Sequence, residues 1–275
     1  MTPILPVVTA ERFRGLIPAS QAALIARFED DLALTRLVYA NCAALGDHET
    51  APTTLVVKGG FAVRHLYGGQ RFSKDADVLP VDPDLDFFGP DHLVDPPGMA
   101  RTQVVVGDAI ASWKVKFAYR PLTIKGSRFI QCDVNGAERP LERRPPQRAM
   151  FVSRFVPSFP VWAATTEEIV AEKLVALMRR RGDRIRDAFD VHHVLTTPIG
   201  VDKAATAAVY ASAARQQKVA VLLREVPATV RAMAGDRSAA AAWSEQLAGA
   251  LPIAVPDFHD HMEDLAALVE SRLLS

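Results

Sequence analysis

The segment from Lys58 to Asp77, KGGFAVRHLYGGQRFSKDAD, constrains the fold of this chain more than any other stretch. The apolar run before it predicts a short buried strand over residues 53–57. Gly59 and Gly60 follow this strand directly, and the spacing of residues 61–67 predicts a short helix. Glycines in this position let the backbone approach a phosphate, and the start of the helix offers free N–H groups. The segment therefore predicts an α/β core.

A pair of acids, Asp75 and Asp77, opens the next predicted strand, over residues 75–80. Residues i and i+2 of a strand point to the same face, so the two carboxylates repel each other unless a cation lies between them. Mg²⁺ or Mn²⁺ with oxygen ligands fits this arrangement. Asp133, in the strand-like stretch 129–134, is a candidate third ligand or general base. The alternatives are a solvated turn for Asp75 and Asp77, and an exposed strand-end acid for Asp133.

The rest of the chain separates into an α/β front half and a helical back half. Ser20 is the expected N-cap of a helix that runs to about Leu45. Residues 82–99 are expected to form a loop or irregular connection, and the Pro- and Arg-rich stretch 136–160 is expected to run over the surface. Strands are expected over 102–106 and 113–119, and helices over 165–182, 184–197, 201–225, 239–251 and 258–274, with Thr165 and Glu168 forming a capping box. We expect two domains, residues 1–160 and 161–275.

Composition excludes some classes of protein and leaves others open. The 275 residues are 49% hydrophobic, and no apolar run approaches the roughly 20 residues of a membrane helix. The start of the chain lacks a signal-peptide pattern, and Cys42 and Cys132 are expected to be buried thiols, so a cytoplasmic protein is expected. The net charge is zero, but residues 111–186 hold sixteen Lys and Arg against seven acids. Such an excess is typical of ordinary solvated surfaces or of polyphosphate and nucleic-acid binding.

A second motif lies in EEIVAEKLVALMRRRGDRIRDAFD. Lys173 and Arg180 are seven residues apart and share one helix face, where their charges could bind the phosphates of a nucleotide. Asp187 and Asp190 share a face of the following helix, from which they could orient the side chains of Lys173 or Arg180 or contact the substrate. The alternatives are a solvated Lys173 and an Asp190 that anchors Arg186. His192 and His193, which follow, are expected to be structural.

These motifs resemble those of a known family. Two glycines, a helix and a D-x-D strand are similar to the polymerase-β-like nucleotidyltransferase superfamily. The segments KGGFAVRHLYGGQRFSKDAD and RD-x-x-D, the latter at Arg186 to Asp190, resemble more closely the signatures of the AbiEii/AbiGii toxin family, which includes MenT-type toxins. Ala76 stands where a larger apolar residue is commoner in the family. The resemblance covers roughly residues 15–200.

The resemblance implies an α/β (α+β) fold, in which a polymerase-β-like core with a mixed sheet precedes a helical C-terminal lobe. It implies transfer of a nucleoside monophosphate from an NTP to RNA, with the 3′ end of a transfer RNA as the expected acceptor, by the toxin of a toxin–antitoxin pair. A cognate antitoxin is then a partner, and no membrane is involved. The expected catalytic residues are Asp75, Asp77, Lys173 and Asp187; the metal ligands are Asp75, Asp77 and Asp133; and the substrate-binding residues are Lys58, Gly59, Gly60, Ser73, Arg180 and Asp190.

Two other functions compete with this one. An antibiotic-type nucleotidyltransferase that modifies a small molecule would use the same acids without the basic excess in 111–186. A nucleotide-binding interaction protein without turnover would have lost a metal-binding acid. Four arginines in the Pro-rich stretch lie outside the motifs and favour an RNA acceptor, because they could contact backbone phosphates: Arg139, Arg143, Arg144 and Arg148.

Overall fold

The computed structural model describes residues 7–44, 55–80, 90–106, 112–135, 145–179 and 185–275. The chain divides into two compact units. Unit 1 comprises Met1–Leu66, Phe72–Glu138 and Pro146–Ala163. Unit 2 comprises Tyr67–Arg71, Arg139–Pro145 and Ala164–Ser275. The short segment Tyr67–Arg71 thus belongs to unit 2, although unit 1 precedes and follows it in sequence.

Unit 1 is built on a mixed sheet of seven strands in the order β3-β4-β5-β2-β1-β7-β6. β2 lies at the middle of the sheet, antiparallel to β1 and parallel to β5. β7 is parallel to β1, and the remaining pairs are antiparallel. The strands are β1 (Leu55–Lys58), β2 (Asp75–Pro80), β3 (Met99–Val106), β4 (Ser112–Tyr119), β5 (Arg128–Asn135), β6 (Gln147–Phe151) and β7 (Phe159–Ala163). The predicted mixed sheet is confirmed.

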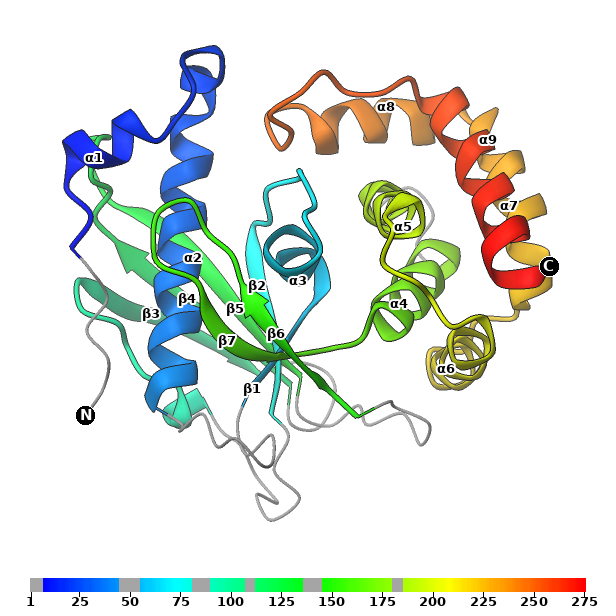
Figure 1. Ribbon diagram of the computed structural model, residues 1–275, viewed down its shortest axis with the longest axis horizontal. Helices are drawn as coiled ribbons and strands as arrows, with labels where there is room; N and C mark the ends of the chain where they lie inside the picture. The colour runs from blue at the N-terminus through cyan, green and yellow to red at the C-terminus, as the bar shows by residue number, and fades with distance from the viewer. Residues whose placement is uncertain (1–6, 45–54, 81–89, 107–111, 136–144, 180–184) are drawn as a thin grey trace. The chain divides into compact units, whose positions relative to one another are not determined.

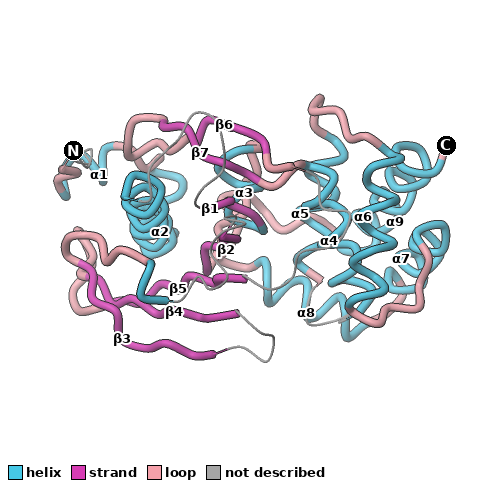
Figure 2. The backbone as a smooth tube through the Cα atoms, turned by 90° about the horizontal axis from the view of Figure 1, so that it is seen from below, coloured by secondary structure: helices cyan, strands magenta, loops and turns pink. Residues whose placement is uncertain are grey.

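Alternation of side chains determines which face of the sheet is buried. Trp113, Val115 and Phe117 of β4 are buried, whereas Lys114 is exposed and Lys116 is half-buried. The sheet curves around α2 (Ile25–Ala44), and α3 (Gly59–Leu66) lies against the other face near β1 and β2 (Figures 1 and 2). Four residues of α2, among them Leu37 and Val38, line a small cavity together with sheet residues from the buried face, which include Val78 and Cys132. Even-numbered residues of β2 and β5 therefore face α2.

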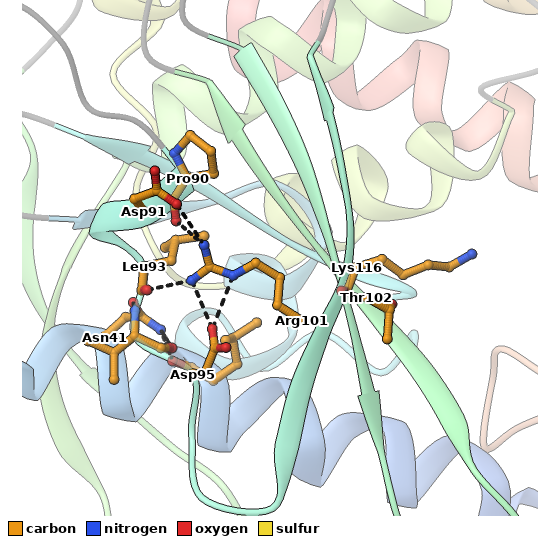
Figure 3. A network of polar contacts seen from close by, with 10 residues as sticks. Asn41, Pro90, Asp91, Leu93, Asp95, Arg101, Thr102 and Lys116 are labelled. Carbon is orange, nitrogen blue, oxygen red and sulfur yellow. Dashed lines mark hydrogen bonds and ion pairs between the residues drawn. The ribbon is translucent and has the colours of Figure 1, made fainter.

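A polar network fixes the chain that precedes β3 on the α2 side of the sheet (Figure 3). The Arg101 guanidinium donates to the carbonyls of Pro90 and Leu93 at 2.8 and 2.7 Å, and to the Asp95 carboxylate. The Asn41 side chain of α2 exchanges two hydrogen bonds with the backbone of Val94. These contacts satisfy backbone groups that have no strand partner. They hold the segment 90–95 against the helix side of the sheet.

Sequence reasoning made three errors about local structure. It missed the strands β6 and β7, which residues 147–151 and 159–163 form. Residues 19–24 form a 3₁₀ turn after Pro18, so the long helix begins at Ile25 and Ser20 is not its N-cap. The third error lies in the stretch 201–225, which is not one helix. It contains α6 (Lys203–Gln216) and, further on, a 3₁₀ turn at Leu223–Glu225. The expected helix boundary at Gly182 and Asp183 lies outside the described residues.

Unit 2 is helical, as expected from the sequence. Its other helices are α4 (Thr166–Arg179), α5 (Arg186–Thr196), α7 (Val226–Ala234), α8 (Arg237–Leu247) and α9 (Phe258–Val269). The Thr165 hydroxyl accepts the backbone N–H of Glu168 at 3.3 Å, which is the expected N-cap contact of α4. The indole of Trp243 is buried and donates to the Pro256 carbonyl at 3.0 Å. Among the described residues, no helix has the length and apolar composition needed to cross a membrane.

Candidate active site

The three predicted metal-binding acids lie on one face of two neighbouring strands. Asp77 of β2 is directly opposite Asp133 of β5 in the parallel ladder, and Asp75 is opposite Gln131. All of them point away from α2, because Ala76 and Cys132 occupy the buried face between them. Burial raises the pKa of the Cys132 thiol, and the negative charges of Asp133, Asp77 and Asp75 raise it further. The fold therefore brings Asp133 beside a pair of carboxylates that precede it by more than 50 residues in the sequence.

Each end of this acidic group has a polar neighbour. The Ser73 hydroxyl donates to Asp75 Oδ1 at 3.2 Å, so Ser73 lies beside the first carboxylate. The side-chain amide of Gln131 donates to Asp133 Oδ1 at 2.6 Å. Lys114 of β4 is opposite Asp133 in the ladder, and its Nζ is 3.9 Å from Asp133 Oδ2. These neighbours orient the carboxylates and reduce their mutual repulsion.

The donor set suits a hard divalent cation. Carboxylate oxygens are the ligands that Mg²⁺ takes in proteins, and the partial exposure of all three acids leaves room for water and phosphate oxygens. Within the part of the chain that the structure describes, no three acidic, His or Cys side chains already converge closely enough to hold an ion. The ladder brings the acids to adjacent positions, and the side chains would have to turn toward a shared ion.

Gly59 is the residue that allows Asp77 its position. Its φ of +68° lies in the left-handed region, where glycine is favoured. A Cβ atom at this position would lie 2.0 Å from Asp77 Oδ2 and 2.7 Å from Asp77 Cγ. The backbone at the start of α3 therefore passes directly against the carboxylate. Lys58 is opposite Asp77 in the β1–β2 ladder, and Gly60 is buried in the first turn of α3.

The residues of the second motif form a buried ionic network in unit 2. Lys173 Nζ is 2.8 Å from Asp187 Oδ1 and 2.7 Å from Asp190 Oδ2. Arg71 completes the network, because its guanidinium makes two hydrogen bonds with the Asp190 carboxylate at 2.9 and 2.6 Å. All four side chains are less than 10% exposed. The network holds two cations and two anions, so its charges balance.

The electrostatics of this network keep its groups charged. Burial alone would raise the pKa of Asp190, but Arg71 and Lys173 outweigh burial and hold that pKa far below its ordinary value. Burial alone would lower the pKa of Lys173, yet Asp187 and Asp190 raise it overall. Asp190 therefore binds Arg71 and Lys173. Sequence reasoning had assigned Arg71 no role, although Arg71 lies in the segment from Lys58 to Asp77.

The remaining candidates are placed as follows. Arg180, Arg139, Arg143 and Arg144 lie outside the described residues, and Arg148 is exposed on β6. His192 is 2.6 Å from Asp264 Oδ2, and His193 hydrogen-bonds the Tyr67 carbonyl at 2.9 Å. Both histidines thus have structural partners in unit 2. Cys132 is buried, as expected, whereas Cys42 is partly exposed.

Comparison with known proteins identifies the family. A family model described as "Nucleotidyl transferase AbiEii toxin, Type IV TA system" matches residues 43–270. The protein is therefore a nucleotidyltransferase, and hence an enzyme. It belongs to the AbiEii toxin family, whose members are the toxins of type IV toxin–antitoxin systems. The family expected from the sequence motifs is therefore confirmed.

Two solved structures resemble this chain at 16% sequence identity. One is a protein from H. pylori assigned as a nucleotidyltransferase; it has a TM-score of 0.45, and the alignment covers 92% of this chain and 94% of that chain. The other is JHP933 from Helicobacter pylori, with a TM-score of 0.41 and coverage of 91% and 89%. A search of curated proteins gave no match.

Proposed function

We propose that this protein transfers a nucleoside monophosphate from an NTP to an RNA acceptor, the 3′ end of a transfer RNA, with the help of Mg²⁺. The observation that carries the proposal is the alignment of Asp75, Asp77 and Asp133 on one sheet face, with Gly59 packed against Asp77. A D-x-D pair beside a third acid is the arrangement that phosphoryl-transfer enzymes use to hold metal ions. As the toxin of a type IV system, the protein would have an antitoxin as its partner.

The reaction is an in-line displacement at the α-phosphorus. The acceptor hydroxyl oxygen forms a bond to phosphorus, the bond to the bridging oxygen of the β-phosphate breaks, and pyrophosphate leaves. The hydroxyl proton passes to a base, and Asp133 is the carboxylate proposed to accept it. Mg²⁺ held by Asp75, Asp77 and Asp133 would neutralise the phosphate charges when it is bound. Ser73 and the backbone at Gly59 and Gly60 are proposed to border the triphosphate.

The ammonium group of Lys173 is held by two buried carboxylates, unlike that of a solvated lysine. An ammonium group has three N–H donors, and the contacts with Asp187 and Asp190 use two of them. The third is the donor that we assign to a phosphate oxygen. Asp187 and Asp190 then hold the ammonium group in one orientation, as expected for a preorganised phosphate contact. Arg180 is proposed to assist from the same helix face.

The test is incubation of the protein with each labelled NTP, Mg²⁺ and total RNA, followed by separation of the RNA. We expect labelled RNA with at least one NTP, and we expect EDTA to abolish the labelling. Asp77→Asn keeps the shape of the side chain without its charge and should be inactive while remaining folded. Transfer of label to a small hydroxylated compound in place of RNA would refute the proposed acceptor. Full activity of Asp77→Asn would refute the proposed metal site.

A further inference from the structure

An exposed aromatic residue lies on the same sheet face as the three acids. Phe129 of β5 is 54% exposed, although β5 is an interior strand between β4 and β2. A large apolar side chain on an interior strand is normally covered, since burial of its surface is favourable. Phe129, Gln131 and Asp133 alternate along β5, so all three side chains point to the same face. The ring is therefore presented outward beside the proposed catalytic acids.

A basic side chain lies beside this ring, and a second lies further along the same strand. Lys116 Nζ lies 5.4 Å from the centroid of the Phe129 ring, within the range of a cation–π contact. Lys116 is opposite Gln131 and Lys114 is opposite Asp133 in the β4–β5 ladder, which places both lysines on the same face as the acids. Figure 3 shows Lys116 leaving β4 on the side opposite to the Arg101 network. The helix side of the sheet is thus separate from this face.

The side chains on this face form a row that extends from the acids to the aromatic ring. Phe129 is four residues from Asp133, which is about 13 Å along a strand at roughly 3.3 Å per residue. Lys114 lies beside the acidic end, and Lys116 lies between Lys114 and the ring. We call this row, Lys114, Lys116, Phe129 and Gln131, the β4–β5 platform. It combines a stacking surface, two cations and an amide next to the acids.

We propose that the β4–β5 platform binds the single-stranded end of the acceptor RNA. A base would stack on Phe129, backbone phosphates would lie near Lys116 and Lys114, and the terminal hydroxyl would reach the acids. Aromatic stacking with cationic neighbours is the general chemistry of single-strand binding, and it tolerates many sequences. The inference rests on the proposed RNA acceptor, and it names the surface that would hold it. The complementary charges favour a nucleic acid over an apolar protein partner.

The experiment measures transfer to RNA over a range of RNA concentrations for Phe129→Ala, Phe129→Trp and Lys116→Gln. Stacking of one base corresponds to roughly 5- to 150-fold in affinity. Phe129→Ala should raise the KM for RNA at least 5-fold while leaving kcat at saturating RNA and the KM for NTP unchanged. Phe129→Trp should keep the wild-type KM, because it keeps a stacking surface. Lys116→Gln should reduce the slope of log affinity against log salt by about 0.7.

Matched controls separate this platform from general surface effects. Met150→Ala removes an apolar side chain of 52% exposure from β6, and Lys218→Gln removes an exposed charge from unit 2. Neither should change the KM for RNA. If Phe129→Ala keeps a wild-type KM while the wild type labels RNA, the platform is refuted and the proposed function stands. The platform is also refuted if Phe129→Ala loses self-association in size-exclusion chromatography but keeps its RNA binding.

A second readout keeps the two proposals distinguishable. If wild-type protein labels no RNA with any NTP, the proposed function fails. Fluorescence anisotropy with a labelled single-stranded RNA oligonucleotide then tests the platform by itself. At least 5-fold weaker binding of that oligonucleotide by Phe129→Ala would support the platform. Equal binding by the wild type and Phe129→Ala, or no binding by either, would overturn it.

Discussion

Replacing Gly59 with alanine should inactivate the enzyme through its neighbour Asp77. The new Cβ would lie 2.0 Å from Asp77 Oδ2, and 3.0 Å from Asp77 Cβ, so the whole side chain must move. The contact is too short by more than 1 Å for ordinary van der Waals packing of about 3.5 Å. Displacement of a reacting group by about 1 Å can cost about 100-fold in rate. Because Asp77 is a proposed metal ligand, we expect at least that loss in nucleotide transfer.

The same substitution also strains the backbone, and this effect must be separated from the collision. A left-handed φ costs a residue with a Cβ about 1–2 kcal/mol. Gly249 provides a matched control, because its φ is +67° and a Cβ added there would meet no atom within 4 Å. Gly249→Ala should therefore lose similar stability without loss of transfer. Urea denaturation gives the stability, and labelled-NTP transfer gives the activity.

Two outcomes would refute this reasoning. If Gly59→Ala transfers nucleotide within two-fold of the wild type, the position of the Asp77 carboxylate does not matter for the reaction. If Gly249→Ala loses activity to the same extent, backbone strain and not the collision explains the defect. Direct measurement of Mg²⁺ binding by calorimetry adds an independent check, since Gly59→Ala should weaken it while Gly249→Ala should not.

Other predictions concern the buried ionic network of unit 2 and, in unit 1, the buried carboxylate of Asp31, which contacts Arg64 and His65. Lys173→Met keeps most of the apolar stem without the charge, and it should raise the KM for NTP severely; a wild-type KM would make Lys173 purely structural. Asp190→Ala leaves Arg71 and Lys173 buried beside a single anion and should lower the free energy of unfolding by about 3–5 kcal/mol. Asp187→Ala should cost less, because Arg71 and Asp190 stay paired; equal losses in urea denaturation would contradict this. In unit 1, burial opposes ionisation of Asp31, but His65 and Arg64 lower its pKa from 3.8 to about 2. The lowered pKa corresponds to about 2 kcal/mol of folding stability, which is present above pH 4 and is lost as the pH falls toward 2. The difference in the free energy of unfolding between the wild type and Asp31→Asn should therefore shrink over that range. A difference of full size at pH 2 would show that the Asp31 pKa is not lowered.

The parts of the fold that could be predicted from sequence are those in which a local pattern is strong. β2 begins at Asp75 and ends at Pro80, as predicted, because its two acids precede an apolar run. β7 was missed because Pro160 lies in a Pro-rich stretch. The parallel ladder of β7 with β1 involves only Trp162 and Ala163, so Pro160 lies beyond it and its missing N–H is not needed there. Buried Phe159, Val161 and Ala163 do alternate, which was the available signal.

Long-range pairings could not be predicted from local periodicity. Arg71 and Asp190 are 119 residues apart, and no spacing rule links a residue in a loop to one in a helix so far away. The sequence predicted that Asp187 and Asp190 share a helix face and could orient Lys173 or Arg180. In the structure both acids contact Lys173, and Arg71 is the partner that was not foreseen. The close contact between Asp77 and Gly59 likewise could not be predicted from the sequence. A glycine at that position indicated close approach to a phosphate, whereas its contact in the structure is a carboxylate.

The alternation that buries the core also fixes the acids in place. A one-residue slip of β5 relative to β2 would turn Asp133 toward α2 and expose Cys132 and Val134. Transfer of an unpaired carboxylate to that apolar side would cost several kcal/mol, and two buried apolar side chains would lose their packing. The same slip would turn Phe129 inward and break its contact with Lys116. The hydrophobic pattern of β5 therefore determines the register, and the register places both the third acid and the proposed RNA platform on one face.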